Sequence, residues 1–139
     1  MCIRDRQKCD ELKISAATEF AGGLSGDALI DLYARSTCLV LPSMSEPWGL
    51  VVNEALGYGC PVVVSDRCGC VPELVIPGET GFSFRAGDVD ELTDKLMRCV
   101  THFRSVESTA IRCISLISAY SPAAAAQQIA HGCKEVLSS

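Results

Sequence analysis

The sequence predicts an α/β protein with a Rossmann-like parallel sheet and helices on both faces. Two apolar runs, TCLVLP at 37–42 and PVVVS at 61–65, show no alternation with polar residues, which is typical of strands buried on both faces. Segments with helical spacing of apolar residues separate these runs. Strands that alternate with helices form parallel sheets, so both observations indicate the same architecture.

The remaining elements follow from local signals along the chain. The first half is predicted to contain a strand at 17–21, a helix at 27–35, a strand at 37–42, a helix at 49–59 and a strand at 61–65. An irregular link with one helical turn follows, and then a strand at 81–84. Three helices are predicted after it: one capped by Asp88, one at about 105–119 and one that begins with Ser121-Pro122. The helix after Asp88 is predicted to bury Val89, Leu92, Leu96 and Val100, and the last helix has an apolar face of Ile129, Cys133, Val136 and Leu137. Residues 37–100 are therefore expected to form a three-strand unit.

Composition excludes several classes of protein. With 48% hydrophobic and 21% charged residues, the 139-residue chain does not resemble a disordered protein. A net charge of −5 and the lack of any Lys- or Arg-rich run argue against nucleic acid as a partner. No apolar run approaches the ~20 residues of a membrane-spanning helix, and the charged N-terminus has no apolar signal region. The expected location is the cytoplasm.

Nine cysteines raise the question of a metal site or a disulfide framework. Most are scattered, and the CGC at 68–70 lacks the two-residue spacing of a zinc site. An odd number also leaves one cysteine unpaired. We therefore expect reduced cysteines that act as small core residues, and no metal.

The stretch EPWGLVVNEALGYGCPVV, at 46–63, contains the candidate site. Its loop, 42–48, follows a predicted strand, and ligands of parallel sheets bind at the carboxyl ends of strands. A helix is predicted to begin at Gly49, where unpaired backbone N–H groups carry partial positive charge and suit a phosphate. Gly49 has no Cβ to keep a ligand from the backbone.

Two carboxylates flank this helix start. Glu46 lies just before it, and Glu54 lies about a turn and a half inside it. Carboxylates accept hydrogen bonds from vicinal hydroxyls, so a phosphate cradle between two such groups fits a nucleotide sugar. The alternative is structural: Glu46 then only favours the helix dipole, and Glu54 is only solvated.

SEPWGLVVNEALGYGCPVVVSD, with DLYARSTCLVLPS before it and VPELVIPGETGFSF after it, resembles the C-terminal donor-binding half of retaining glycosyltransferases of the GT-B fold. That group includes mannosyltransferases, sucrose synthases and glycogen synthases, and the resemblance covers roughly residues 17–100. It implies that Glu46 is the catalytic-site carboxylate that contacts donor sugar hydroxyls. Donor sugar and phosphate contacts are implied for Glu46, Pro47, Trp48, Gly49 and Leu50. Glu54 is implied to bind the ribose, and Gly23 and Leu24 the nucleobase. No cofactor and no metal are implied.

The resemblance also suggests a domain organisation. Residues 1–16 are a lead-in, foreign to the fold or a partial helix, residues 17–120 a partial nucleotide-sugar-binding domain, and residues 121–139 a C-terminal helix. The first two of the family's six strands have no counterpart, and neither does its N-terminal acceptor domain. Between Arg35 and Arg67 no Lys or Arg is present to neutralise a diphosphate. We therefore expect an inactive fragment, and the resemblance allows a peripheral membrane contact of the parent enzyme.

The function implied is transfer of a hexosyl unit from a nucleotide sugar to an acceptor hydroxyl, with retention at the anomeric carbon. Two alternatives stay open: a nucleotide-binding module without catalysis, and a nucleotide-sugar epimerase of the same fold. A nicotinamide dehydrogenase is disfavoured because no G-x-G-x-x-G follows a strand.

Overall fold

The computed structural model describes residues 3–103 and 105–138. The chain divides into two units, Met1–Ile30 and Asp31–Ser139, and helix α2 (Asp27–Arg35) crosses the boundary between them. The first unit contains helix α1 (Ile3–Glu11) and a short 3-10 helix, η1 (Ser15–Ala17).

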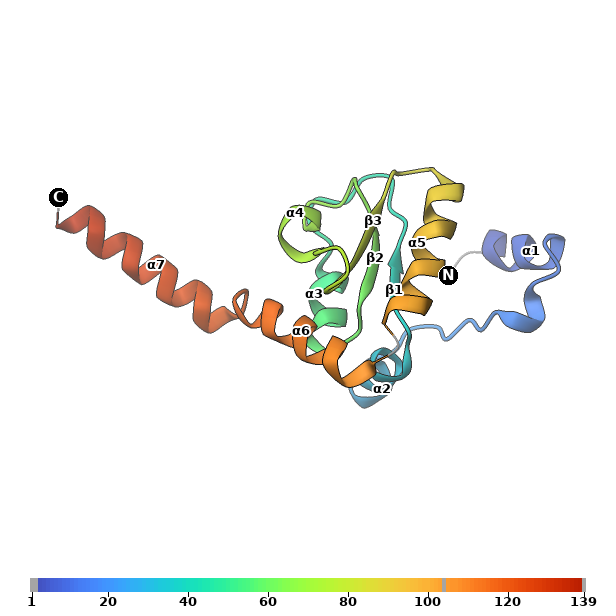
Figure 1. The fold of residues 1–139 in the computed structure, drawn as a ribbon, viewed down its shortest axis with the longest axis horizontal. Helices are drawn as coiled ribbons and strands as arrows, with labels where there is room; N and C mark the ends of the chain where they lie inside the picture. Colours follow the sequence, from blue (N-terminus) through green and yellow to red (C-terminus); the bar gives the residue numbers. More distant parts are fainter. Residues whose placement is uncertain (1–2, 104, 139) are drawn as a thin grey trace. The chain divides into compact units, whose positions relative to one another are not determined.

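The second unit is built on a three-stranded parallel sheet in the order β1-β2-β3 (Figure 1). Its remaining elements, in chain order, are β1 (Leu39–Leu41), α3 (Leu50–Gly57), β2 (Val62–Ser65), α4 (Val71–Leu74), β3 (Gly81–Phe84), α5 (Val89–His102), α6 (Val106–Ser118) and α7 (Pro122–Leu137). In the register, Leu39 lies opposite Val62, and Val62 lies opposite Gly81. The predicted three-strand unit over 37–100 is confirmed.

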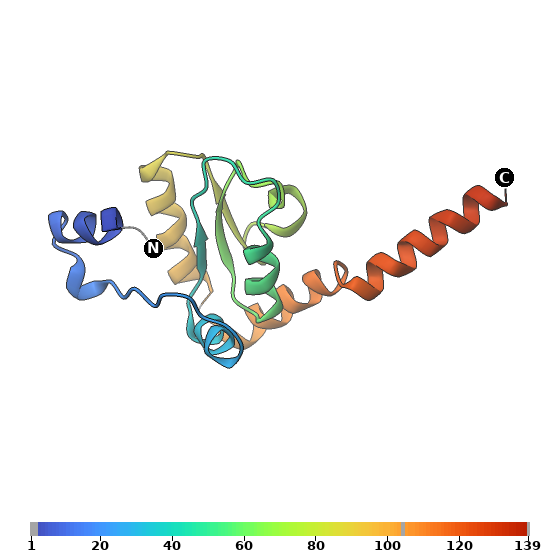
Figure 2. The same ribbon diagram turned by 180° about the vertical axis from the view of Figure 1, so that it is seen from behind.

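Helices cover both faces of this sheet. All four residues of β2 are buried, as the apolar run without alternation indicated. Helix α3 contacts β1 and β2 and packs on α6, whereas α5 contacts β2 and β3. Both ribbon views draw α3 and α5 on opposite sides of the strands (Figures 1 and 2). The fold is thus the predicted Rossmann-like α/β arrangement.

Helix α5 begins where the sequence predicted, but its buried face is different. The Asp88 carboxylate accepts a hydrogen bond of 2.9 Å from the Glu91 backbone N–H, as an N-cap should. The core beneath α5 consists of Val63, Phe82, Phe84, Cys99 and Phe103, with Cys38, Leu92 and Leu96 packed against it. Val89 and Val100, which were predicted to be buried, are 71% and 56% exposed. Cys99, smaller than valine, takes the place that Val100 was expected to fill.

The predicted strand at 17–21 is wrong. Ser15–Ala17 form η1, and residues 18–21 adopt no regular structure. A strand exists only where its N–H and C=O groups pair with a neighbour. The described sheet ends at β1 and β3, and no strand in it pairs with this segment.

Helix α7 has the predicted apolar face, and no other described element covers it. The Ser121 hydroxyl caps it by accepting the Ala124 backbone N–H at 3.2 Å, yet none of its residues is buried. Ile129, Val136 and Leu137 are among its exposed side chains.

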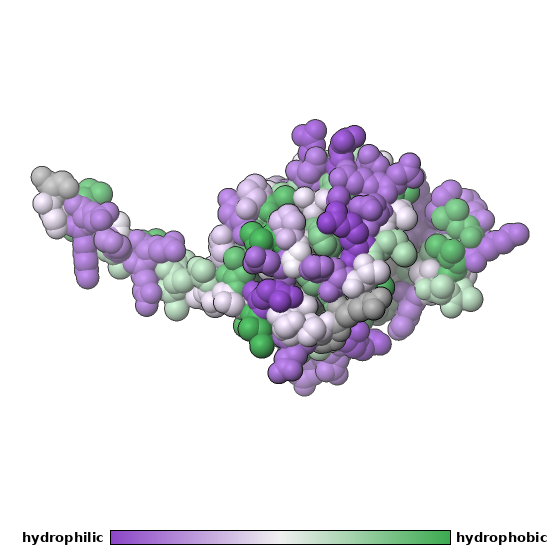
Figure 3. Space-filling view, in the orientation of Figure 1, coloured by the Kyte–Doolittle hydropathy of each residue, from purple (hydrophilic) through white to green (hydrophobic). Residues whose placement is uncertain are grey.

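Figure 3 shows hydrophobic patches interrupted by hydrophilic residues over one face of the molecule. No helix in the described ranges is long and apolar enough to cross a bilayer.

The cysteines behave mainly as core residues, which gives a testable prediction. Burial raises the pKa of Cys60 to about 12, and burial raises the pKa of Cys70 and Cys113 to about 11. Protonated, buried thiols react slowly. We therefore expect an aromatic disulfide reagent to label the exposed Cys133 in the native protein, but Cys60, Cys70 and Cys113 only after unfolding. Mass spectrometry of peptides at increasing urea measures this, and equal labelling rates without urea would contradict it.

Candidate functional site

Two loops at the carboxyl ends of β1 and β2 are joined by backbone hydrogen bonds. The Glu46 N–H donates to the Arg67 carbonyl at 3.0 Å, and the Gly69 N–H donates to the Glu46 carbonyl at 3.0 Å. The Cys70 N–H donates to the Trp48 carbonyl at 3.1 Å. The backbone of the loop 42–48 is therefore held at the strand ends, where the sequence predicted a ligand site.

The start of α3 presents unpaired backbone donors. Gly49 precedes the helix with φ of 96°, a left-handed conformation that side chains disfavour. Its carbonyl accepts the Val52 N–H at 2.8 Å, which closes the first turn. The N–H groups of residues 48–51 find no acceptor within the described residues. These donors and the helix dipole make this an anion-binding geometry.

Glu46 lies beside these donors. It is half-buried, and its Cγ lies 3.5 Å from the position that a Cβ on Gly49 would occupy. It also lines a cavity of about 330 Å³ with residues of the loop 66–72. Arg67 lines the same cavity and has no ion-pair partner in the described part of the chain. Arg67 was not predicted from the sequence, because the loop pairing that brings it beside Glu46 joins positions 21 residues apart.

Glu54 faces the solvent from the next turn of α3. It lies four residues after Leu50, so both belong to one exposed helix face. The Tyr33 hydroxyl donates a hydrogen bond of 3.2 Å to Glu54 Oε2. Glu54 does not line the cavity that contains Glu46. The two carboxylates thus flank the helix start, one beside the cavity and one along the exposed face.

Trp48 and Pro47 contribute mainly backbone to this region. The Trp48 ring is half-buried, and its Nε1–H donates to Asn53 Oδ1 at 2.8 Å, which fixes the ring to α3. The Pro47 carbonyl approaches Gly69 so closely that a Cβ there would lie 2.0 Å from its oxygen. The Trp48 ring is thus packed against α3, whereas the Pro47 side chain is exposed and its carbonyl faces Gly69.

Gly23 and Leu24 lie in the first unit, in an irregular segment before α2. Gly23 is exposed and Leu24 is half-buried. Their nucleobase role stays a prediction. Glu73, in α4, is exposed, and its side chain makes no hydrogen bond to the described residues. No group of three metal-ligating side chains is present in residues 3–103 and 105–138.

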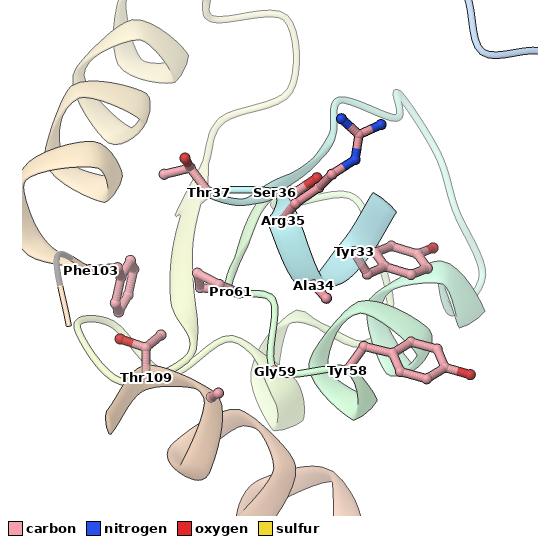
Figure 4. A pocket seen from close by; sticks show the side chains of 11 residues that line it. Tyr33, Ala34, Arg35, Ser36, Thr37, Tyr58, Gly59, Pro61, Phe103 and Thr109 are labelled. Carbon is pink, nitrogen blue, oxygen red and sulfur yellow. The ribbon is translucent and has the colours of Figure 1, made fainter. Parts of the chain in front are cut away.

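A second cavity, of about 340 Å³, lies at the other end of the sheet (Figure 4). Thr37 and Pro61, which precede β1 and β2, line it together with Phe103 and Thr109. Figure 4 shows the Tyr33 and Tyr58 rings side by side at one edge of it. This cavity was not predicted from the sequence, because its walls come from stretches that are distant in the chain: 33–37, 58–61, and Phe103 with 109–110.

A family model confirms the family that the resemblance suggested. The model described as "Glycosyl transferases group 1" matches residues 5–105. The chain belongs to this family. The match begins within the segment 1–16 and includes the whole sheet together with the loop and helix around Glu46.

Individual relatives show what share of a longer protein this chain matches. A sulfoquinovosyl transferase of Arabidopsis thaliana is 39% identical over 102 residues, which are 71% of this chain and 20% of that protein. A glycogen synthase of Mycobacterium tuberculosis is 43% identical over 77 residues, covering 55% of this chain and 18% of that protein. The chain therefore spans about a fifth of the length of these relatives.

Solved structures show the same fold. A sucrose-phosphate synthase from Thermosynechococcus elongatus superposes with a TM-score of 0.82 at 25% identity, over 97% of this chain and 34% of that chain. The lipopolysaccharide outer core galactosyltransferase WaaB gives a TM-score of 0.72 at 21% identity, over 87% and 34% of the two chains. The second likeness shows the fold alone.

Proposed function

We propose that this chain forms the donor-binding part of a cytoplasmic enzyme that moves a hexosyl unit from a nucleotide sugar to an acceptor hydroxyl, with retention at the anomeric carbon. The single observation that carries the proposal is the row of unpaired N–H groups at the start of α3, flanked by Glu46 and Glu54. Membership of the group 1 glycosyltransferase family supports it.

Each group of the site is assigned to the part of the donor that its position favours. The N–H groups at 49–51 take the distal phosphate, where negative charge grows as the bond to the anomeric carbon breaks. Glu46, beside them, accepts hydrogen bonds from the donor sugar. Glu54, further along the exposed face of α3, accepts hydrogen bonds from the ribose. The acceptor oxygen forms the new bond to the anomeric carbon as the bond from that carbon to the distal phosphate oxygen breaks. The acceptor proton passes to the departing nucleoside diphosphate.

Positive charge is the scarce component of this site. A helix start supplies about half a charge, whereas a departing diphosphate carries roughly two. Arg67 is the side chain of the cavity that adds a full positive charge. We assign it to the diphosphate, and the proposal includes no metal. Chelation with EDTA is accordingly expected to leave nucleotide affinity unchanged.

Calorimetry with the full chain tests the proposal. UDP, GDP and ADP are titrated to find the preferred nucleotide, and its nucleotide sugar follows. We expect Glu54→Gln to weaken binding of the nucleoside diphosphate about tenfold, because a charged hydrogen bond contributes more than ~1.4 kcal/mol. Glu46→Gln should weaken binding of the nucleotide sugar but not of the nucleoside diphosphate, because Glu46 is proposed to contact only the sugar.

The matched control is Glu73→Gln, which makes the same chemical change at an exposed glutamate of α4. Its affinities should equal those of the unmodified chain. Absence of nucleotide binding, or equal losses in all three variants, would contradict the proposal.

A further inference from the structure

Glu54 is held by a contact that the sequence did not indicate. Its Oε2 accepts a hydrogen bond from the Tyr33 hydroxyl at an oxygen–oxygen distance of 3.2 Å, across 21 positions of the chain. Glu54 is otherwise a glutamate on an exposed helix face, where its side chain would sample several rotamers. Among the described residues, Oε1 has no hydrogen-bond partner. One oxygen of the carboxylate is thus anchored, and the other is left for a ligand.

Tyr33 is itself rigid. It is buried, with 7% of its surface exposed, and its ring stacks on Tyr58 with centroids 5.8 Å apart and planes 15° apart. Burial, followed by the nearby Glu54 carboxylate, raises the pKa of Tyr33 to about 12. The hydroxyl therefore keeps its proton at neutral pH and remains a donor.

We propose that Tyr33 is a positioning residue, which holds the Glu54 carboxylate so that Oε1 accepts a hydrogen bond from a ribose hydroxyl. The inference rests on the proposed function, because it assumes that Glu54 binds ribose. It adds that recognition of ribose depends on a buried tyrosine of α2, outside the loop and helix that contact the donor. A fixed carboxylate loses less conformational entropy when the ligand binds than a mobile one.

Tyr33→Phe tests this inference, because it retains the ring and the stacking but removes the hydroxyl. The probes are the nucleoside diphosphate that the chain binds most tightly among UDP, GDP and ADP, and its 2′,3′-dideoxy analogue. Calorimetry gives the ratio of the two affinities for each variant. We expect the unmodified chain to prefer the ribonucleotide. Tyr33→Phe should weaken binding of the ribonucleotide about tenfold and leave the affinity for the dideoxy analogue unchanged.

Tyr58→Phe is the matched control. It removes a hydroxyl from the other ring of the stacked pair, and that hydroxyl makes no hydrogen bond to Glu54 in the described structure. Its affinity ratio should equal that of the unmodified chain. A purely structural role of Tyr33 would weaken both nucleotides equally, which would overturn the inference.

The outcomes distinguish a failure of the Tyr33 inference from a failure of the ribose role of Glu54. If Glu54→Gln abolishes the preference for ribose and Tyr33→Phe retains it, the role of Tyr33 is wrong and the proposed function stands. If the unmodified chain shows no preference for the ribonucleotide, the ribose role of Glu54 is wrong, and the inference fails with it.

Discussion

Leu56→Ala is expected to lower the free energy of unfolding by about 2–5 kcal/mol, through lost burial and the cavity left behind. Leu56 lies in α3, is fully buried and is among the largest such side chains of the chain. Because α3 packs on β1, β2 and α6, the cavity would open between the sheet and two helices. Small domains have total stabilities of only about 5–15 kcal/mol, so this loss is large.

Urea unfolding followed by the fluorescence of Trp48, the only tryptophan, measures the effect. Leu50→Ala is the control, since it makes the same change in the same helix at a side chain that is 71% exposed. Its effect should stay within about 0.5 kcal/mol. Similar losses in both variants would show that Leu56 is not part of the core.

Gly69→Ala is expected to damage both stability and nucleotide binding. A Cβ at this position would lie 2.0 Å from the Pro47 carbonyl oxygen and 3.0 Å from its carbon, so the two loops must separate. That movement breaks the hydrogen bonds that join Gly69 and Cys70 to Glu46 and Trp48. We expect a loss of about 1–3 kcal/mol in stability. Binding should weaken more than tenfold, because Glu46 and the start of α3 move together.

Gly57→Ala is the matched control for this prediction. A Cβ there meets no atom within 4 Å, and the residue lies in the last turn of α3. Alanine in a helix should stabilise the chain by about 0.5–1 kcal/mol and leave nucleotide affinity unchanged. Unfolding curves and calorimetry of the same samples give both readouts. Wild-type affinity in Gly69→Ala would contradict the role of the paired loops.

Local patterns predicted the second unit well because its strands are short and apolar and several of its helices begin at clear caps. The runs at 37–42, 61–65 and 81–84 each contain a strand, and Asp88 caps its helix as expected. The segment 17–21 carries similar residues but forms no strand, since pairing depends on neighbours that a local pattern does not contain. The buried face of α5 was misplaced because Cys99 and Val100 differ by one position and are both apolar.

The candidate site was predictable where its residues are adjacent in the chain. Glu46, Gly49 and the helix start lie together because they are within five positions of one another. The glycine and the carboxylate could therefore be recognised from a short stretch of sequence. Tyr33 and Arg67 were missed because each meets the site from a segment about twenty residues away. The hydrogen bond from Tyr33 to Glu54 and the pairing of two loops bring them near.

The most direct test of the account follows backbone amide resonances while the preferred nucleoside diphosphate is added to the full chain. The account predicts that the amide signals of Gly49, Leu50 and Val51 shift in proportion to occupancy, because these N–H groups form new hydrogen bonds to phosphate. Saturable binding that leaves these three signals unmoved and shifts Thr37 and Phe103, in the cavity of Figure 4, would contradict it.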